Sequence, residues 1–139
     1  MSAACLREVR EFLDKWQTDP LNVRRAFTAY RDFLANLPGV SLDFKARPGV
    51  SYSLRARHEA QQQRELFVLV DVVDDEPESR WLSVCFYADM ITDPDELGDY
   101  VPEGLMGEDA CCFNLDEDDA AMRDYIAARM AEAAKNAAA

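Results

Sequence analysis

The chain has 139 residues, of which 49% are apolar and 30% charged, a balance that fits one globular domain and excludes a disordered protein. Its net charge of −12 is uneven: residues 1–64 hold 11 Lys/Arg and 7 Asp/Glu, whereas residues 65–139 hold 4 and 20. The negative field repels nucleic-acid phosphate and no apolar run could span a bilayer, so we expect neither a nucleic-acid nor a membrane partner.

Two amphipathic helices are predicted at the start of the chain. Apolar residues recur at helical spacing from Cys5 to Gln17 and again from Val23 to Leu37. Asp19 and Pro20 are a good N-cap and first position for the second helix, and "LPG" at 37–39 ends it. Charges interrupt the first segment, so it does not have the apolar core of a signal peptide, and we expect a cytoplasmic protein.

The hydrophobic period changes from 3.6 to 2 after residue 39. Residues 40–47 and 50–57 both alternate apolar with polar side chains, which predicts an antiparallel hairpin. A three-residue loop, 47–49, keeps the two faces separate, because it sets Ala46 opposite Val50 and Phe44 opposite Tyr52. Two further strands, 65–73 and 80–91, are predicted to continue the sheet as a meander.

The second half of the sequence predicts less regular structure. Asp93 and Pro94 indicate one short helical turn, and the glycines within 98–107 favour irregular backbone. A short fifth strand at 110–115 leads into a helix of about 117–135, with Asp116 as N-cap and a frayed tail at 136–139. We therefore expect one α+β domain, 1–139, with two layers: an antiparallel meander sheet of about five strands, two N-terminal helices and one C-terminal helix.

Metal ligands are plentiful but poorly arranged in the sequence. The four cysteines and single histidine do not have zinc-site spacing, so we expect four reduced thiols. The acids at 116–119 are explained by a helix start. The acids between 93 and 109 have two interpretations. They could bind iron or calcium loosely as an acidic ridge, which is the alternative function, or they could simply form a solvated surface. The candidate ridge consists of Asp93, Asp95, Glu96, Asp99, Glu108 and Asp109.

A second group of candidates belongs to the sheet. The polar face of the predicted hairpin carries Lys45, Arg47, Arg55 and Arg57. These residues either form a docking strip for an acidic partner or are simply the polar side of a half-exposed sheet. Trp81 and Tyr87 lie on the strand face opposite Leu82, Val84 and Phe86. Helices on one side cover only one of these faces, so we expect the other to support self-association as a homodimer. The rival arrangement covers both faces, with helices or with the 98–109 segment.

No catalytic constellation is evident. His58 lies in a glutamine-rich loop, and no nucleophile, phosphate-binding or zinc-protease motif is present. The sequence does not decide between enzyme and non-enzyme, but it favours a non-catalytic protein-interaction module, chaperone-like in character, that uses no cofactor.

From Leu37-Pro38-Gly39 onward the chain resembles the small YjbR-like α+β proteins, over roughly its last two-thirds. The resemblance implies a helix ending in Leu-Pro-Gly, an antiparallel meander and a covering C-terminal helix; it assigns no catalytic residue. In size, acidity and composition of elements the chain is also similar to class I type III secretion chaperones, which are dimeric. Frataxin-like iron chaperones are a third acidic α+β likeness, although the first helix here is charge-balanced.

Overall fold

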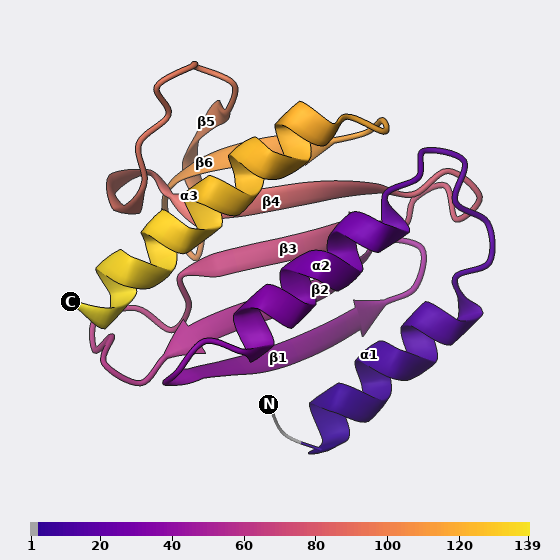
Figure 1. Cartoon of the computed structure of the whole chain (residues 1–139), viewed down its shortest axis with the longest axis horizontal. Coiled ribbons are helices and arrows are strands. Elements are labelled where there is room, and N and C mark those ends of the chain that lie inside the picture. The colour runs from indigo at the N-terminus through magenta and orange to yellow at the C-terminus, as the bar shows by residue number, and fades with distance from the viewer. Residues whose placement is uncertain (1–2) are drawn as a thin grey trace.

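The computed structural model describes residues 3–139; Met1 and Ser2, which belong to the predicted domain, lie outside the described residues. Three α-helices and six strands make up the fold (Figure 1). The helices are α1 (Ala3–Lys15), α2 (Arg24–Ala35) and α3 (Ala120–Ala138), with a short 3-10 helix, η1 (Ala88–Met90), after the fourth strand. The strands are β1 (Val40–Arg47), β2 (Ser51–His58), β3 (Val68–Val73), β4 (Trp81–Tyr87), β5 (Asp99–Leu105) and β6 (Glu108–Leu115).

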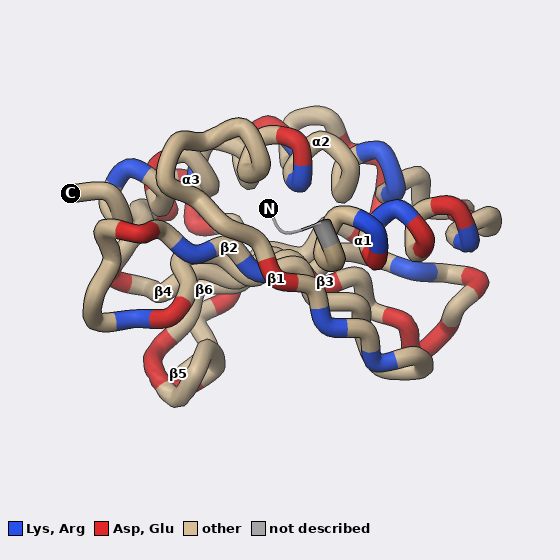
Figure 2. The backbone as a smooth tube through the Cα atoms, turned by 90° about the horizontal axis from the view of Figure 1, so that it is seen from below, with Lys and Arg blue, Asp and Glu red and all other residues tan. Residues whose placement is uncertain are grey.

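The α+β prediction is confirmed. The strands form one antiparallel sheet in the order β1-β2-β3-β4-β6-β5, so the first four follow one another as the predicted meander. All three helices lie on the same side of this sheet (Figure 2). The sheet has six strands instead of about five, because part of the glycine-containing segment forms β5.

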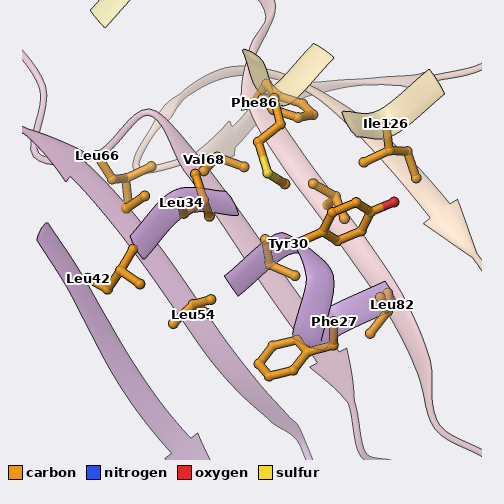
Figure 3. Close-up of a cluster of buried hydrophobic side chains, with 14 of the residues drawn as sticks. Phe27, Tyr30, Leu34, Leu42, Leu54, Leu66, Val68, Leu82, Phe86 and Ile126 are labelled. Atoms are coloured by element: carbon orange, nitrogen blue, oxygen red, sulfur yellow. The ribbon is translucent and has the colours of Figure 1, made fainter. Parts of the chain in front are cut away.

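The core fills the space between the helices and one face of the sheet. Phe27, Tyr30 and Leu34 on α2 point onto the strands (Figure 3) and are almost fully buried. Leu54 and Phe86 are among the fully buried residues that meet them from the sheet. These are the periodic apolar positions of the sequence, so burial of one stripe per helix and one face per strand accounts for the two layers.

The helix ends use the acids differently from the predictions. The N-cap of α2 is Val23, so the assignment of Asp19 as N-cap and Pro20 as first helical position was wrong. The Asp19 carboxylate instead accepts the backbone N–H groups of Val23 and Arg24, at 3.0 and 2.9 Å, from the loop before the helix. The N-cap of α3 is Asp119, whose Oδ1 accepts the N–H of Met122 at 3.1 Å, so the assignment of Asp116 was wrong. The tail expected to fray is helical as far as Ala138.

The β1–β2 hairpin keeps the predicted faces with a different register. Ala46 pairs with Tyr52 and Phe44 with Leu54, so the three-residue loop is 48–50 instead of 47–49. A shift of two residues leaves every side chain on its own face. Asp74 fixes the turn, because its Oδ2 accepts the N–H of Gly49 at 2.8 Å, where the backbone has a φ of +84°.

The segment between β4 and β6 departs most from the predictions. No helix forms at 93–96; instead the Asp93 carboxylate accepts the N–H groups of Leu97 and Gly98 at 3.0 and 2.9 Å and closes a loop. β5 then pairs with β6 as an edge strand, with a register irregularity between Val101 and Leu105. Of residues 3–139, no helix is long and apolar enough to cross a membrane.

Candidate interaction surface

None of the helices in residues 3–139 lies on the second side of the sheet (Figure 2). We call this side the open face. Because directly paired residues of antiparallel strands share a face, the register defines its members. Three neighbouring rows of paired residues cross the strands on this face. The middle row is Lys45, Ser53, Asp71, Ser83 and Asn114. The row on one side of it is Arg47, Ser51, Val73 and Trp81, and the row on the other side is Asp43, Arg55, Leu69, Cys85, Cys112 and Asp99.

The four basic residues singled out from the sequence all lie on the open face, on β1 and β2. Arg57 pairs with Asp43 at 3.0 Å, and Arg55 donates from Nε to the Ser53 hydroxyl at 3.3 Å. Within the described residues, Lys45 and Arg47 make no ion pair. This strip therefore presents cationic groups that are available to an anionic partner.

Trp81 and Tyr87 belong to the same side of the sheet, but only Trp81 is accessible. Trp81 is half-buried and lies in the row of Arg47, whereas Tyr87 is 1% exposed. The guanidinium of Arg64 covers Tyr87, with its central carbon 4.1 Å from the ring centroid. Tyr87 is thus enclosed by the loop after β2 and is not part of the accessible surface.

Arg64 is held in this covering position by two carboxylates. It binds Asp89 through two hydrogen bonds of 2.7 and 3.0 Å and Glu108 through two of 2.8 and 3.2 Å. The hydrogen bonds from Arg64 keep the pKa of Asp89 below its usual value. Burial raises the pKa of the Tyr87 hydroxyl beneath it. The cluster closes one end of the open face and leaves Lys45 and Arg47 exposed and Trp81 half-buried at the other end.

A buried carboxylate lies in the middle of the open face. Asp71 stands between Ser53 and Ser83 in the register, and its Oδ1 is buried without a hydrogen bond to any described residue. Burial raises the pKa of Asp71, and the Ser53 hydroxyl and the nearby Arg55 only partly oppose this rise. An incompletely satisfied charge costs folding free energy, so this position is not optimised for stability alone.

We expect the substitution Asp71→Asn to raise the free energy of unfolding at pH 7 by about 1 kcal/mol, since it removes a buried charge. When the pKa of a carboxyl is higher in the folded chain than in the unfolded chain, the carboxyl destabilises the fold at every pH above its folded pKa. This destabilisation disappears once the pH is below its pKa in the unfolded chain. The advantage of the variant should therefore shrink as the pH falls from 7 toward about 4. Urea unfolding at several pH values measures it, with exposed Asp75→Asn as the control. A variant less stable than the parent at pH 7 would contradict the prediction.

The cysteines correct another prediction. Cys85 on β4 and Cys112 on β6 are direct cross-strand partners and form a disulfide, so the expectation of four reduced thiols was wrong. Adjacent Cys111 points to the other face and is not part of this bond. Spacing along the chain could not reveal the pair, because their proximity depends on the non-consecutive pairing of β4 with β6.

The acidic candidates do not converge. Asp93 is a loop cap; burial tends to raise its pKa, but hydrogen bonds from Tyr125 and two backbone N–H groups lower it overall. Asp109 accepts the Tyr100 hydroxyl, which lowers its pKa, and Glu108 binds Arg64. Asp95, Glu96 and Asp99 are exposed. Among residues 3–139 no group of three or more acids, histidines or cysteines is placed to hold a metal ion, and metal binding at 93–109 stays a prediction.

The structure thus places Lys45, Arg47, Arg55 and Trp81 on one side of the sheet, with Trp81 three strands away from Arg47, and it does not bring the acidic candidates together. Sequence reasoning missed Arg64 and Asp71, although an aspartate inside an otherwise apolar strand was a detectable signal for the latter. No family model matches this chain, and no curated protein or solved structure is significantly similar to it.

Proposed function

We propose that this protein is a non-catalytic protein-interaction module, chaperone-like in character, which binds its partner through the open face. The observation that carries the proposal is the coexistence on one uncovered sheet face of Lys45, Arg47 and Arg55 with the half-buried ring of Trp81. Aromatic and arginine side chains contribute much of the binding energy at protein interfaces, and unpaired cations select acidic partners.

The charge layout also supports a second copy of the chain as partner. The strand order puts basic β1 and β2 at one end of the sheet and acidic β5 at the other. If two copies stack open face to open face about a two-fold axis parallel to the strands, the β1–β2 end of each lies over the β5 end of the other. Lys45 and Arg47 of one copy then approach Asp99 and its neighbours in the next, and the interface closes on itself.

We expect light scattering at micromolar concentration to give the mass of a dimer, and the substitution Trp81→Glu to give a monomer with unchanged far-ultraviolet dichroism. The reason is that a buried, unpaired carboxylate in the stacked faces opposes association. Leu6→Glu is the matched control, because Leu6 is 40% exposed on α1, away from the open face. High salt should also weaken the dimer.

A monomer mass for the parent chain would contradict self-association without excluding a different partner. The broader proposal is tested by pull-down from native cytosol, comparing the parent with Lys45→Glu/Arg47→Glu/Arg55→Glu. Loss of a specific acidic partner is the expected result, and identical capture by both would contradict a role for the open face.

We place this activity in the cytoplasm, as the sequence suggests. The relationship to YjbR-like proteins also stays a prediction. The alternative function, loose iron or calcium binding by the 93–109 acids, is separated by calorimetric titration: saturable binding that neutralisation of Asp95, Glu96 and Asp109 weakens would favour it over the interaction module.

A further inference from the structure

The side of the molecule opposite the open face contains an apolar groove between α2 and α3. It consists of two cavities of about 640 and 220 Å³, and Phe33 lines both. The larger is lined mainly by apolar residues, including Leu37, Val40 and Ala134, and the smaller by residues such as Ala26 and Tyr30. One charge of each sign also lines each cavity, from Glu59 and Lys135 in the larger and from Arg123 and Asp124 in the smaller, so these side chains leave the direction of the field to the two helices. Phe33 is 38% exposed, although it stands on the same helix as the buried Phe27 and Leu34. The groove is therefore an apolar surface that this chain leaves unfilled.

The two walls of the groove share a spacing. Residues four, three and four positions apart line it on both sides: Ala26, Tyr30, Phe33 and Leu37 on and just after α2, and Ala127, Ala131, Ala134 and Ala138 on α3. This is the spacing with which one helix presents a continuous seam to another. Because the four α3 residues at this spacing are all alanine, large side chains from an incoming helix have room to enter, while Arg123, Asp124 and Lys135 line the cavities beside them.

The electrostatics of the groove favour one helix direction. The N-terminal halves of α2 and α3 line the smaller cavity and their C-terminal ends line the larger one, so the two helices run the same way (Figure 1). Their dipoles therefore add, with partial negative charge at the larger cavity and partial positive charge at the smaller. A helix lying antiparallel to both places its positive N-terminus at the larger cavity, and its charge is complementary at both ends.

We propose that this groove binds an amphipathic helix of a partner protein, antiparallel to α2 and α3. The span from Ala26 to Leu37 is about 17 Å of helix, or roughly three turns. The occupant therefore presents large apolar side chains such as leucine at the same four-three-four spacing over about three turns. This surface is separate from the open face, so the inference does not depend on the function proposed above.

The experiment uses a synthetic peptide of alanine, glutamate and lysine with four leucines at four-three-four spacing. A control peptide has the same composition but distributes the leucines around the helix. Fluorescence anisotropy against the full chain should show saturable binding for the first peptide only. The substitution Ala131→Glu on the groove wall should weaken binding at least about tenfold, since it places a charge in the apolar seam. Ala128→Glu is the control, on an exposed position of α3 that does not line the groove.

Orientation is tested with a nitroxide at either end of the peptide. A label at the peptide N-terminus should broaden amide signals near Leu37 and Lys135, and one at its C-terminus those near Ala26 and Ala127. Three outcomes would overturn the proposal: equal binding of the control peptide, equal losses for the two glutamate variants, or the opposite pattern of broadening. Circular dichroism of Ala131→Glu verifies that the variant is folded.

Discussion

Replacing Arg80 with alanine is expected to lower the free energy of unfolding by about 3–5 kcal/mol, because it leaves a buried carboxylate without its counter-ion. The Nε of Arg80 lies 2.7 Å from Oδ1 of Asp74, and both side chains are largely buried. The guanidinium also stands 5.3–5.6 Å from the ring centroids of Phe12, Trp16 and Tyr52. Arg80 thus joins the sheet to α1 as well as neutralising Asp74.

The substitution of Arg80 should also destabilise the β1–β2 turn, because Asp74 supports that turn. The same carboxylate holds the β1–β2 turn through the N–H of Gly49, and the backbone N–H of Asp74 donates to the carbonyl of Val50 at 2.9 Å. If Asp74 moves toward water to regain solvation, the hairpin turn loses its support. Loss of the ion pair therefore affects two elements that are distant from one another in the sequence.

Urea unfolding measures this prediction, with Arg57→Ala as the matched control. Arg57 also pairs with an aspartate, Asp43, but both side chains are more than half exposed, so its loss should cost about 1 kcal/mol or less. The double substitution Asp74→Asn/Arg80→Met should be less destabilised than Arg80→Ala alone, since no unpaired charge remains. Equal effects of Arg80→Ala and Arg57→Ala would refute the importance of the buried pair.

The second large effect is expected at Phe27, where substitution by alanine should cost about 3–5 kcal/mol. Phe27 is fully buried, and its ring centroid lies 5.9 Å from that of Phe12 and 6.3 Å from that of Trp16. Removing the ring creates a cavity where α1, α2 and the sheet meet, and the packed neighbours can close it only in part.

Phe33→Ala is the control for Phe27→Ala because both residues are on α2. Phe33 faces the groove and is partly exposed, so the same substitution should cost about 1 kcal/mol or less. The comparison uses the midpoint and slope of denaturant curves. A loss at Phe33 as large as that at Phe27 would mean that the groove wall belongs to the core.

The periodic parts of the sequence were sufficient to predict the fold. The stripes around Phe27 and Leu34 and the alternation through Leu42 and Leu54 each have one buried face, which period alone predicts. Period also placed the four basic residues on one face of the hairpin and Trp81 on the strand face opposite Leu82, whereas only the register shows that these two faces are the same side of the sheet. Period did not fix the hairpin register, because Asp74, from another strand end, positions the turn.

The remaining errors arise where distant residues decide the structure. Pro102 and neighbouring glycines disfavour a strand, yet pairing with β6 makes β5 regular enough to join the sheet. The alternation along β4 predicted that Tyr87 would be exposed, but Arg64, from the polar loop between β2 and β3, covers its ring. No local pattern distinguishes Asp116 from Asp119 as the cap, since either can precede the helix.

Among the described strands, β1 and β5 are the edges of the sheet, each paired on one side only, and this limits how copies of the chain can assemble. An unpaired strand edge can recruit the strand of another molecule, and repetition of that contact produces fibres. Here β5 carries Pro102, which has no N–H to donate, and Glu103 with a φ of +55°, while β1 alternates charged Asp43, Lys45 and Arg47 along its length. Open-ended growth is therefore blocked at both edges, and concentrated solutions should remain free of thioflavin-positive fibres while contacts through either face stay finite in stoichiometry.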